Sequence, residues 1–254
     1  MHEKLRDKEW SYSALSLYND CPASFKAHYI DELPSKSNAF AEYGGFVHDI
    51  LNRFFRGKLE DFELVSIYRK HYVENVVSEF PFLGKTDLSE TYYTQGYEYL
   101  FHFKGFDGYE VVGSEIEFRT TIADKRFIGF IDLLLKDAEG NYIIVDHKSK
   151  NKFKSKKERT EYLRQLYLYS VWVKEEYGEY PTELWFNMFR GKIDKNKFVE
   201  DDLKKALIWA EFTLDMIDFD TTWQKSGDYF YCRNLCDVRD YCEEAQENEE
   251  ISDR

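Results

Sequence analysis

The sequence has little proline, no long apolar run and no net positive charge. Only four of its 254 residues are proline, whereas 43% are hydrophobic and 18% aromatic, which excludes disordered and collagen-like chains. No stretch approaches the roughly 18 uninterrupted apolar residues of a membrane-spanning helix, and the start, MHEKLRDKEW, lacks the apolar centre of a signal peptide. We therefore expect a soluble, cytoplasmic protein of a bacterium, an archaeon or a phage-infected cell, with no membrane partner.

The formal net charge of -13 argues against a nucleic-acid partner, because Lys and Arg side chains drive binding to phosphates. The charge is unevenly distributed along the chain. The last twelve residues, EEAQENEEISDR, hold six acidic residues against one arginine and are expected to form a solvated tail. Residues 148–159, KSKNKFKSKKER, hold seven basic residues and one acidic residue. This segment is a candidate phosphate contact, although a solvated loop explains it equally well.

Hydrophobic spacing predicts that the first third of the chain is mainly helical. A helix capped by Ser11 or Ser13 is interrupted at Cys21-Pro22, and a second helical piece follows to residue 30. Apolar residues at helical spacing predict three more helices, around residues 46–55, 64–77 and 92–100.

The pattern then changes to short segments rich in Val, Ile and Phe. The prediction is three strands (111–121, 126–136 and 142–148), a helix around 162–173, a strand over 184–189 and a helix over 203–217. We expect one α/β (α+β) domain over residues 1–254, with a mixed sheet flanked by helices. Its parts are a mainly helical part (1–105), a sheet core (106–200), a helix with three cysteines (201–242) and an acidic tail (243–254).

Two carboxylates and a lysine lie on the predicted strands. Asp132 stands among apolar residues in FIGFIDLLL, and Asp146 precedes Lys148 by two positions in YIIVDHKSK, which places those two side chains on one face of the sheet. Charges at the end of an apolar strand cost desolvation, and a shared divalent cation relieves it. A metal site beside an ammonium group suits phosphodiester hydrolysis. An isolated Asp-x-Lys pattern is also common as a surface ion pair.

The specificity of the pattern lies in the order of several motifs. In chain order they are His48 on a helix, Glu115 on a strand, Gly129-Phe130-Ile131-Asp132, Asp146-His147-Lys148, and Gln165 with Tyr169 on the next helix. This order resembles the PD-(D/E)XK nuclease superfamily in its RecB-like branch, which has a helix histidine, GxxD, DxK and QxxxY. The opening segment, SYSALSLYNDCPASFKAHYI, is also similar to that branch, so the resemblance covers nearly the whole chain. It implies a restriction-endonuclease-like fold.

The resemblance implies a metal site. Asp132, Asp146, His48 and the backbone carbonyl of His147 would hold Mg²⁺ or Mn²⁺. By itself, a histidine beside an apolar helix face is more often a partly buried packing residue than a ligand. It is the match to the family that makes His48 a ligand candidate.

The resemblance also implies roles beyond the metal. Lys148 would orient the attacking water and stabilise charge in the transition state. Gln165 and Tyr169 would contact the substrate or support the site. Glu115 and Glu117 lie on the same face of one predicted strand, so either matches the first acidic position of the family. We favour Glu115.

The four cysteines are Cys21 and a group of three, Cys232, Cys236 and Cys242. Four thiolates bind a [4Fe–4S] cluster or a tetrahedral zinc ion, and disulfides are unexpected in a chain without an export signal. AddB-type helicase-nucleases and CRISPR adaptation nucleases carry one upstream and three downstream cysteines on such a cluster, and this chain resembles them. The spacing C-x₃-C-x₅-C departs from the family, where two residues usually separate the first pair, so zinc stays an alternative.

The resemblance implies a metal-dependent deoxyribonuclease, with exonuclease action on single-stranded DNA or on DNA with free ends. Its role would lie in recombination, repair, replication or a phage equivalent, with a homo-oligomer or a recombination or helicase partner. One alternative is a CRISPR adaptation nuclease that trims DNA before integration. Another is a non-catalytic, cluster-stabilised subunit that binds DNA or protein, which the acidic balance favours and the intact Asp132, Asp146 and Lys148 oppose.

Overall fold

The computed structural model describes residues 2–242 and divides the chain into two compact units. The central unit comprises residues 39–120 and 128–207. The terminal unit combines three separate segments, residues 2–38, 121–127 and 208–242. The predicted acidic tail, residues 243–254, lies outside the described residues.

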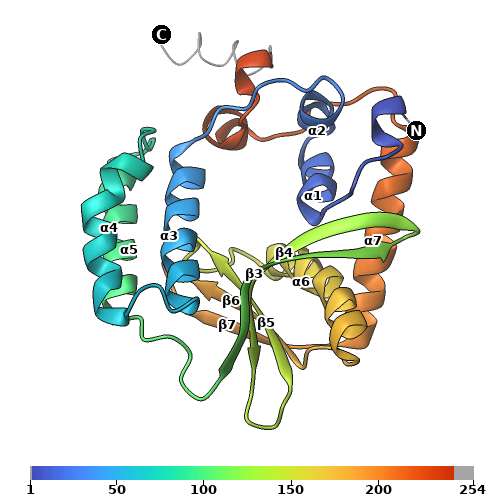
Figure 1. Ribbon diagram of the computed structural model, residues 1–254. Helices are drawn as coiled ribbons and strands as arrows, with labels where there is room; N and C mark the ends of the chain where they lie inside the picture. The colour runs from blue at the N-terminus through green and yellow to red at the C-terminus, as the bar shows by residue number, and fades with distance from the viewer. Residues whose placement is uncertain (1, 243–254) are drawn as a thin grey trace. The chain divides into compact units, whose positions relative to one another are not determined.

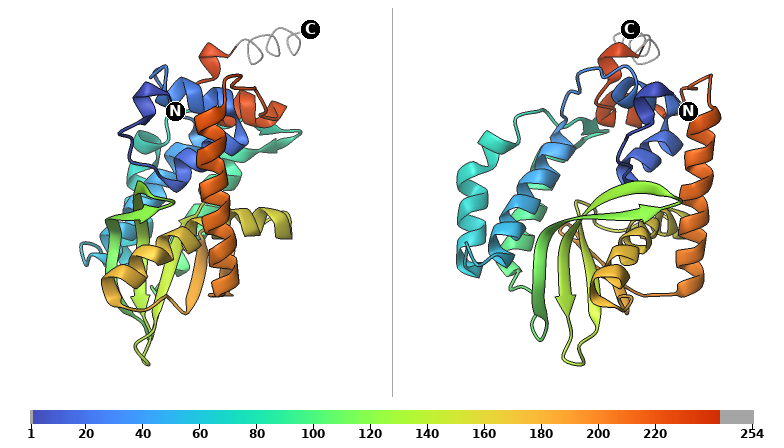
Figure 2. Two further views of the ribbon diagram at one scale, coloured as in Figure 1. Left: turned by 90° about the vertical axis from the view of Figure 1, so that its right-hand side faces the viewer. Right: turned by 45° about the vertical axis from the view of Figure 1, so that its right-hand side comes forward.

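The central unit is built on a five-stranded mixed sheet with the order β3-β4-β5-β6-β7. The pairs β4/β5 and β6/β7 are antiparallel, whereas β5 and β6 are parallel. A parallel pair needs a long crossover, and helix α6 provides it beside the sheet (Figure 2). The elements are β3 (Glu110–Ile122), β4 (Lys125–Lys136), β5 (Tyr142–Lys148), α6 (Lys156–Tyr177), β6 (Glu183–Met188) and β7 (Ile193–Lys197).

Strand β5 is the most deeply buried strand of the sheet. All of its residues except Lys148 are buried, as expected for a central strand that is covered on both faces. Its register pairs Asp146 with Phe186 and Lys148 with Met188 of β6. A carboxylate and an ammonium group therefore emerge where this apolar strand ends.

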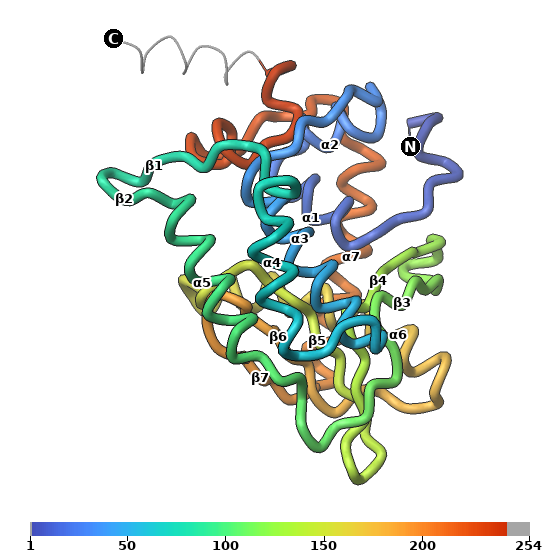
Figure 3. Tube along the Cα trace, turned by 60° about the vertical axis from the view of Figure 1, so that its left-hand side comes forward, coloured from blue at the N-terminus to red at the C-terminus, as the bar shows by residue number. Residues whose placement is uncertain are grey.

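Three helices of the central unit pack side by side next to the sheet (Figure 1). They are α3 (Ala39–Phe55), α4 (Asp61–Asn75) and α5 (Leu88–His102). A short hairpin, β1 (Phe82–Leu83) and β2 (Thr86–Asp87), connects α4 to α5 (Figure 3). The helices share an aromatic core, in which the rings of Phe46 and Tyr68 stack at 5.7 Å. Burial of this core holds α3, and the histidine that it carries, in place.

The terminal unit contains α1 (Tyr12–Asp20), α2 (Pro22–Tyr29), the second half of α7 (Glu200–Phe219) and the short helices η1 (Glu3–Leu5), η2 (Tyr231–Leu235) and η3 (Arg239–Tyr241). The Ser11 hydroxyl accepts a hydrogen bond from the Ala14 N–H, so Ser11 rather than Ser13 caps α1. Pro22 begins α2, where its missing N–H costs nothing. The Tyr18 hydroxyl donates to Asp220 at 2.9 Å, which links the two ends of the chain within this unit.

The α/β fold predicted from the sequence, a mixed sheet flanked by helices, is confirmed. Two features were missed, the β1–β2 hairpin and strand β7. The sequence of β7, IDKNK, is polar and alternates between exposed and partly buried positions, so it lacks the apolar signal of an internal strand. Among the helices in residues 2–242, none combines the length and apolar character needed to cross a membrane.

Candidate active site

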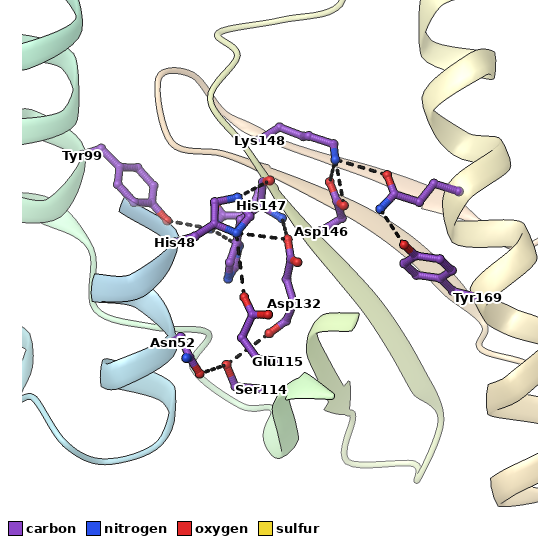
Figure 4. A network of polar contacts seen from close by, with 12 residues as sticks. His48, Asn52, Tyr99, Ser114, Glu115, Asp132, Asp146, His147, Lys148 and Tyr169 are labelled. Carbon is purple, nitrogen blue, oxygen red and sulfur yellow. Dashed lines mark hydrogen bonds and ion pairs between the residues drawn. The ribbon is translucent and has the colours of Figure 1, made fainter. Parts of the chain in front are cut away.

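Three potential metal ligands from three elements of the central unit come together. They are His48 of α3, Glu115 of β3 and Asp132 of β4, and their ligand atoms lie within 4.8 Å of one another (Figure 4). His48 Nδ1 is 3.6 Å from Asp132 Oδ2 and 4.0 Å from Glu115 Oε1. Within residues 2–242 this is the one group of three His, Cys, Asp or Glu side chains so arranged. We call it the ligand trio.

The backbone of His147 closes the ligand trio. His48 Nε2 is 2.8 Å from the carbonyl oxygen of His147, and the N–H of His147 donates to Asp132 Oδ2 at 2.6 Å. The ring of His147 is buried; its Nδ1 is 3.0 Å from Asn187 Nδ2, which also donates to the Tyr99 hydroxyl at 2.6 Å. Burial, and then the charge of His48, hold the pKa of His147 well below its usual range, so the ring is neutral. His147 therefore offers its carbonyl oxygen to the site.

Asp146 and Lys148 lie on one face of β5, as their spacing in the sequence predicts. Lys148 Nζ is 2.9 Å from Asp146 Oδ1 and 2.8 Å from Oδ2. Lys148 also donates to Gln165 Oε1 at 3.2 Å, and Gln165 Nε2 donates to the Tyr169 hydroxyl at 3.1 Å (Figure 4). Gln165 and Tyr169 of α6 thus fix the ammonium group of Lys148. Asp146 lies outside the ligand trio in the structure, where its carboxylate pairs with Lys148.

The buried carboxylates dominate the electrostatics of this region. Burial, and then the charge of Asp146, raise the pKa of Asp132 well above its usual range. Burial lowers the pKa of His48, but the Glu115 carboxylate, 4.0 Å away, and the charge of Asp132 outweigh burial and raise the pKa overall. Likewise, burial lowers the pKa of Lys148, and Asp146 and Asp132 more than reverse this. Carboxylates held this close in a buried site suit a divalent cation, which would neutralise their repulsion.

A left-handed residue in β3 directs Glu115 toward His48. Glu115 has a φ of 51°, a conformation that is rare for a residue other than glycine and typical of a bulged strand. Glu117 points elsewhere, where it is exposed and paired with Arg119 at 2.6 Å. The structure therefore brings Glu115, and not Glu117, into the ligand trio.

Ser114, which precedes Glu115, is fixed by contacts with three other residues, and these contacts hold the backbone at Glu115. The Ser114 hydroxyl lies 3.0 Å from Asn52 Oδ1 and 3.1 Å from the carbonyl oxygen of Asp132, and Arg56 donates to the Ser114 carbonyl at 3.0 Å. No motif in the sequence pointed to Asn52, Arg56 or Ser114. A signal was present, because residues 48, 52 and 56 follow one another at intervals of four and so share one face of a helix.

We expect Glu115→Gly to unfold at the same or a higher denaturant concentration than the natural chain. Glycine adopts positive φ without steric cost, and the relief of about 1 kcal/mol offsets the loss of the side chain. The matched control is Glu117→Gly, at an ordinary extended position of the same strand, which should cost about 1 kcal/mol. Urea denaturation of both variants without metal measures the difference. Equal destabilisation of the two would show that the backbone at Glu115 is unstrained.

Gly129, the first residue of the GxxD motif, allows the sheet and α6 to approach closely. A Cβ at this position would lie 2.4 Å from the ring of Phe118 and 2.9 Å from the ring of Tyr169. These two rings meet edge to face at 5.0 Å. Gly129 therefore serves the packing of Tyr169, whose hydroxyl ends the chain of contacts that begins at Lys148.

The four cysteines lie in the terminal unit and line one cavity of about 430 Å³. All four are free thiols, with Cys21 and Cys236 buried and Cys232 and Cys242 partly exposed. Burial, and then Cys236, Cys242 and Cys21, raise the pKa of Cys232, so the Cys232 thiol lies in the electrostatic field of the other three. Among residues 2–242, no three cysteine sulfurs lie within 4.8 Å of one another.

Fold and site together define a class of enzyme. The mixed sheet presents an Asp-x-Lys strand end, two carboxylates converge with a helix histidine in a candidate metal site, and a glutamine holds the lysine, an arrangement that suits a nuclease. The model of the PD-(D/E)XK nuclease superfamily matches residues 9–243. The chain belongs to this superfamily.

A solved structure shares the fold at low sequence identity. The structure of a "Putative exonuclease" from Eubacterium rectale superposes with a TM-score of 0.52 at 10% identity, covering 95% of this chain and 92% of that one. The structure of SSO0001 gives a TM-score of 0.40 at 14% identity, covering 95% of this chain and 87% of that one. No curated protein matches the chain.

Proposed function

We propose that this protein is a Mg²⁺- or Mn²⁺-dependent DNA exonuclease that hydrolyses the phosphodiester bonds of single-stranded or resected DNA. The observation that supports it best is the ligand trio next to the Asp146–Lys148 pair, with Lys148 held by Gln165. Carboxylates that converge with a histidine and a carbonyl oxygen form a donor set that suits Mg²⁺ or Mn²⁺. His48, Asp132, Asp146 and the His147 carbonyl would hold the ion, and Glu115 would face it.

A bound divalent ion would lower the pKa of a water and neutralise charge on the phosphate. The chain itself contributes position and charge. Lys148 would hold the attacking water against the phosphorus atom and stabilise the negative charge that develops on the phosphate oxygens. Gln165 and Tyr169 would keep the ammonium of Lys148 in a fixed orientation during attack.

The exonuclease assignment draws on the fold shared with the "Putative exonuclease" of Eubacterium rectale. A role in recombination, repair, replication or a phage equivalent follows from the resemblance to the RecB-like branch. End-labelled linear single strands, linear duplexes and a circular single strand, each with Mn²⁺, Mg²⁺ or EDTA, test the assignment. We expect mononucleotides or short products from linear single strands, and no product from the circle. Cleavage of the circle would make the enzyme an endonuclease, and the absence of cleavage on every substrate would support a non-catalytic DNA-binding subunit.

The cavity lined by the four cysteines is proposed to hold a [4Fe–4S] cluster. A tetrahedral zinc ion with bonds of about 2.3 Å draws its sulfurs to within about 3.8 Å of one another. The thiols of this chain are more widely spaced, since no three of their sulfurs in residues 2–242 lie within 4.8 Å. A cubane cluster suits the wider spacing, because each thiolate binds a different iron atom. Arg239 lines the same cavity and would offset part of the negative charge of such a cluster, whereas Lys26, which also lines it, is paired with Asp31 at 2.6 Å.

Purification without oxygen, followed by visible absorbance and by analysis of iron, sulfide and zinc, tests the cluster. We expect a brown protein with about four iron and four sulfide per chain. One zinc per chain without iron or sulfide would show that the cysteines bind zinc and not an iron-sulfur cluster. A chain with neither metal would overturn the metal assignment of the cysteines.

A further inference from the structure

A second concave surface of the central unit lies between the loop that follows β5 and the turn from β6 to β7. It has a volume of about 950 Å³ and is open to solvent along its length. Its lining includes six basic residues, Lys152, Lys156, Arg159, Arg190, Lys192 and Lys195. Asp194 is the one acidic residue among the described residues that line it. We call this surface the basic groove.

The walls of the basic groove are held together. Arg159 Nη2 donates to Asp194 Oδ1 at 2.7 Å, which ties the start of α6 to β7. Gly191 approaches the opposite loop so closely that a Cβ would lie 2.0 Å from the carbonyl oxygen of Asn151. Arg190 stacks on the ring of Tyr92 at 3.4 Å. The groove therefore has a defined shape, unlike a loop surface that solvent alone surrounds.

The positive charge of the basic groove is largely uncompensated. Arg159 forms an ion pair with Asp194, and the Lys195 ammonium lies 3.6 Å from the centre of the Trp185 ring. Lys152, Lys156 and Lys192 are exposed and make no ion pair with any of residues 2–242. Three like charges gathered in one groove repel one another, and an anionic ligand would relieve the repulsion. The chain as a whole carries a net charge of -13, so the groove is a local region of the opposite sign.

The basic groove begins next to the candidate active site. Met188, which lines the groove, is the register partner of Lys148 on β5, and Asn151 follows Lys148 by three residues. Three extended residues span at most about 10 Å, so the groove starts within roughly that distance of Lys148. A polymer that is cut beside Lys148 would have its neighbouring units in this groove.

Apolar side chains accompany the lysines of the basic groove. Phe153 and Ile193 line it, so apolar surface for bases lies beside charge for phosphates, the combination found in proteins that bind single strands.

We propose that the basic groove binds the backbone of single-stranded DNA next to the scissile phosphate, with Lys152, Lys156 and Lys192 as the phosphate contacts. This inference rests on the proposed nuclease function, and it names the surface along which the substrate strand runs. It also assigns a role to the basic segment 148–159 that the sequence leaves open.

The test is the affinity of the full chain for a fluorescent oligothymidine in EDTA, as a function of salt, so that no cleavage is required. The variant is Lys152→Gln/Lys156→Gln/Lys192→Gln. Each lost phosphate contact lowers the slope of log affinity against log salt by about 0.7 for a single strand, so the slope should fall by about 2. If the variant and the natural chain bind equally at 1 M salt, the variant should bind about 100-fold more weakly than the natural chain at 0.1 M salt. The matched control, Lys58→Gln/Lys70→Gln/Lys85→Gln, removes the same charge from exposed lysines of the same unit and should change the slope little.

The outcomes separate this proposal from the proposed function. Equal slopes for the two triple variants would overturn the groove, whether or not the protein cleaves DNA. If only the groove variant shows a smaller salt slope, and the natural chain cleaves no substrate, the groove binds DNA but the proposed nuclease activity is wrong. Tighter binding of a duplex, or of an oligouridine of equal length, would overturn the assignment to single-stranded DNA.

Discussion

Asp132→Asn is expected to lower metal-dependent cleavage by about 10³-fold while the chain stays folded. Asparagine has nearly the same shape, and its side-chain oxygen still accepts the hydrogen bond that the His147 N–H donates at 2.6 Å. The substitution removes the negative charge that Asp132 brings to the ligand trio. Cleavage rates at saturating Mn²⁺ measure the effect. Asp107→Asn, an exposed aspartate of the same unit, serves as the matched control and should cleave like the natural chain.

Without metal, Asp132→Asn should melt at the same temperature as the natural chain or above it. The carboxylates of the partly buried Asp132 and the buried Asp146 repel one another, and desolvation already disfavours the charged form of Asp132. Removal of one of the two charges therefore removes this repulsion from the folded state and stabilises it. Thermal melting in EDTA measures this. A variant that melts well below the natural chain, or that cleaves at the natural rate, would show that Asp132 serves the fold and not the chemistry.

Cys236→Ala is expected to remove the visible absorbance of the protein and to lower its melting temperature by about 10 °C. Metal binding to a site that forms only in the folded chain contributes directly to folding stability. A loss of about 3–5 kcal/mol corresponds to this shift, at about 2–4 °C per kcal/mol for a chain of this size. Limited proteolysis should cut first within residues 2–38 and 208–242, because these segments form the terminal unit.

Lys225→Gln is the matched control for Cys236→Ala. Lys225 lines the same cavity and is exposed, and its replacement leaves all four thiols intact. It should keep the absorbance and nearly the full melting temperature. If both variants melt alike and the absorbance survives in Cys236→Ala, the cavity holds no metal bound through Cys236.

Much of the sheet was predictable because its strands carry strong local signals. Strand β5 is an apolar run that ends in Asp146-His147-Lys148, and the alternation of side chains along a strand is enough to place Asp146 and Lys148 on one face. Strand β7 gives no such signal, because it lies at the edge of the sheet and half of its surface is exposed. Its place in the sheet depends on pairing with β6, which is a tertiary contact.

The geometry around Glu115 was not predictable from alternation alone. A regular strand would turn Glu115 and Glu117 to the same face, whereas the left-handed backbone at Glu115 separates them. That conformation depends on Ser114, which is held by Asn52 of α3 and by Arg56, the residue that follows α3, more than 55 residues earlier in the chain. Interactions over such a separation leave no local pattern at the strand itself. The one sign of them in the sequence is the interval of four that separates His48, Asn52 and Arg56.

We expect a divalent ion to bind at the ligand trio. A crystal grown with Mn²⁺ and measured for anomalous scattering locates the ion directly. We expect a peak at about 2.0–2.3 Å from a His48 ring nitrogen and an Asp132 oxygen, with the His147 carbonyl as a further ligand, and no such peak in Asp132→Asn. A peak elsewhere in the central unit, or none with Mn²⁺ in millimolar excess, would contradict the claim.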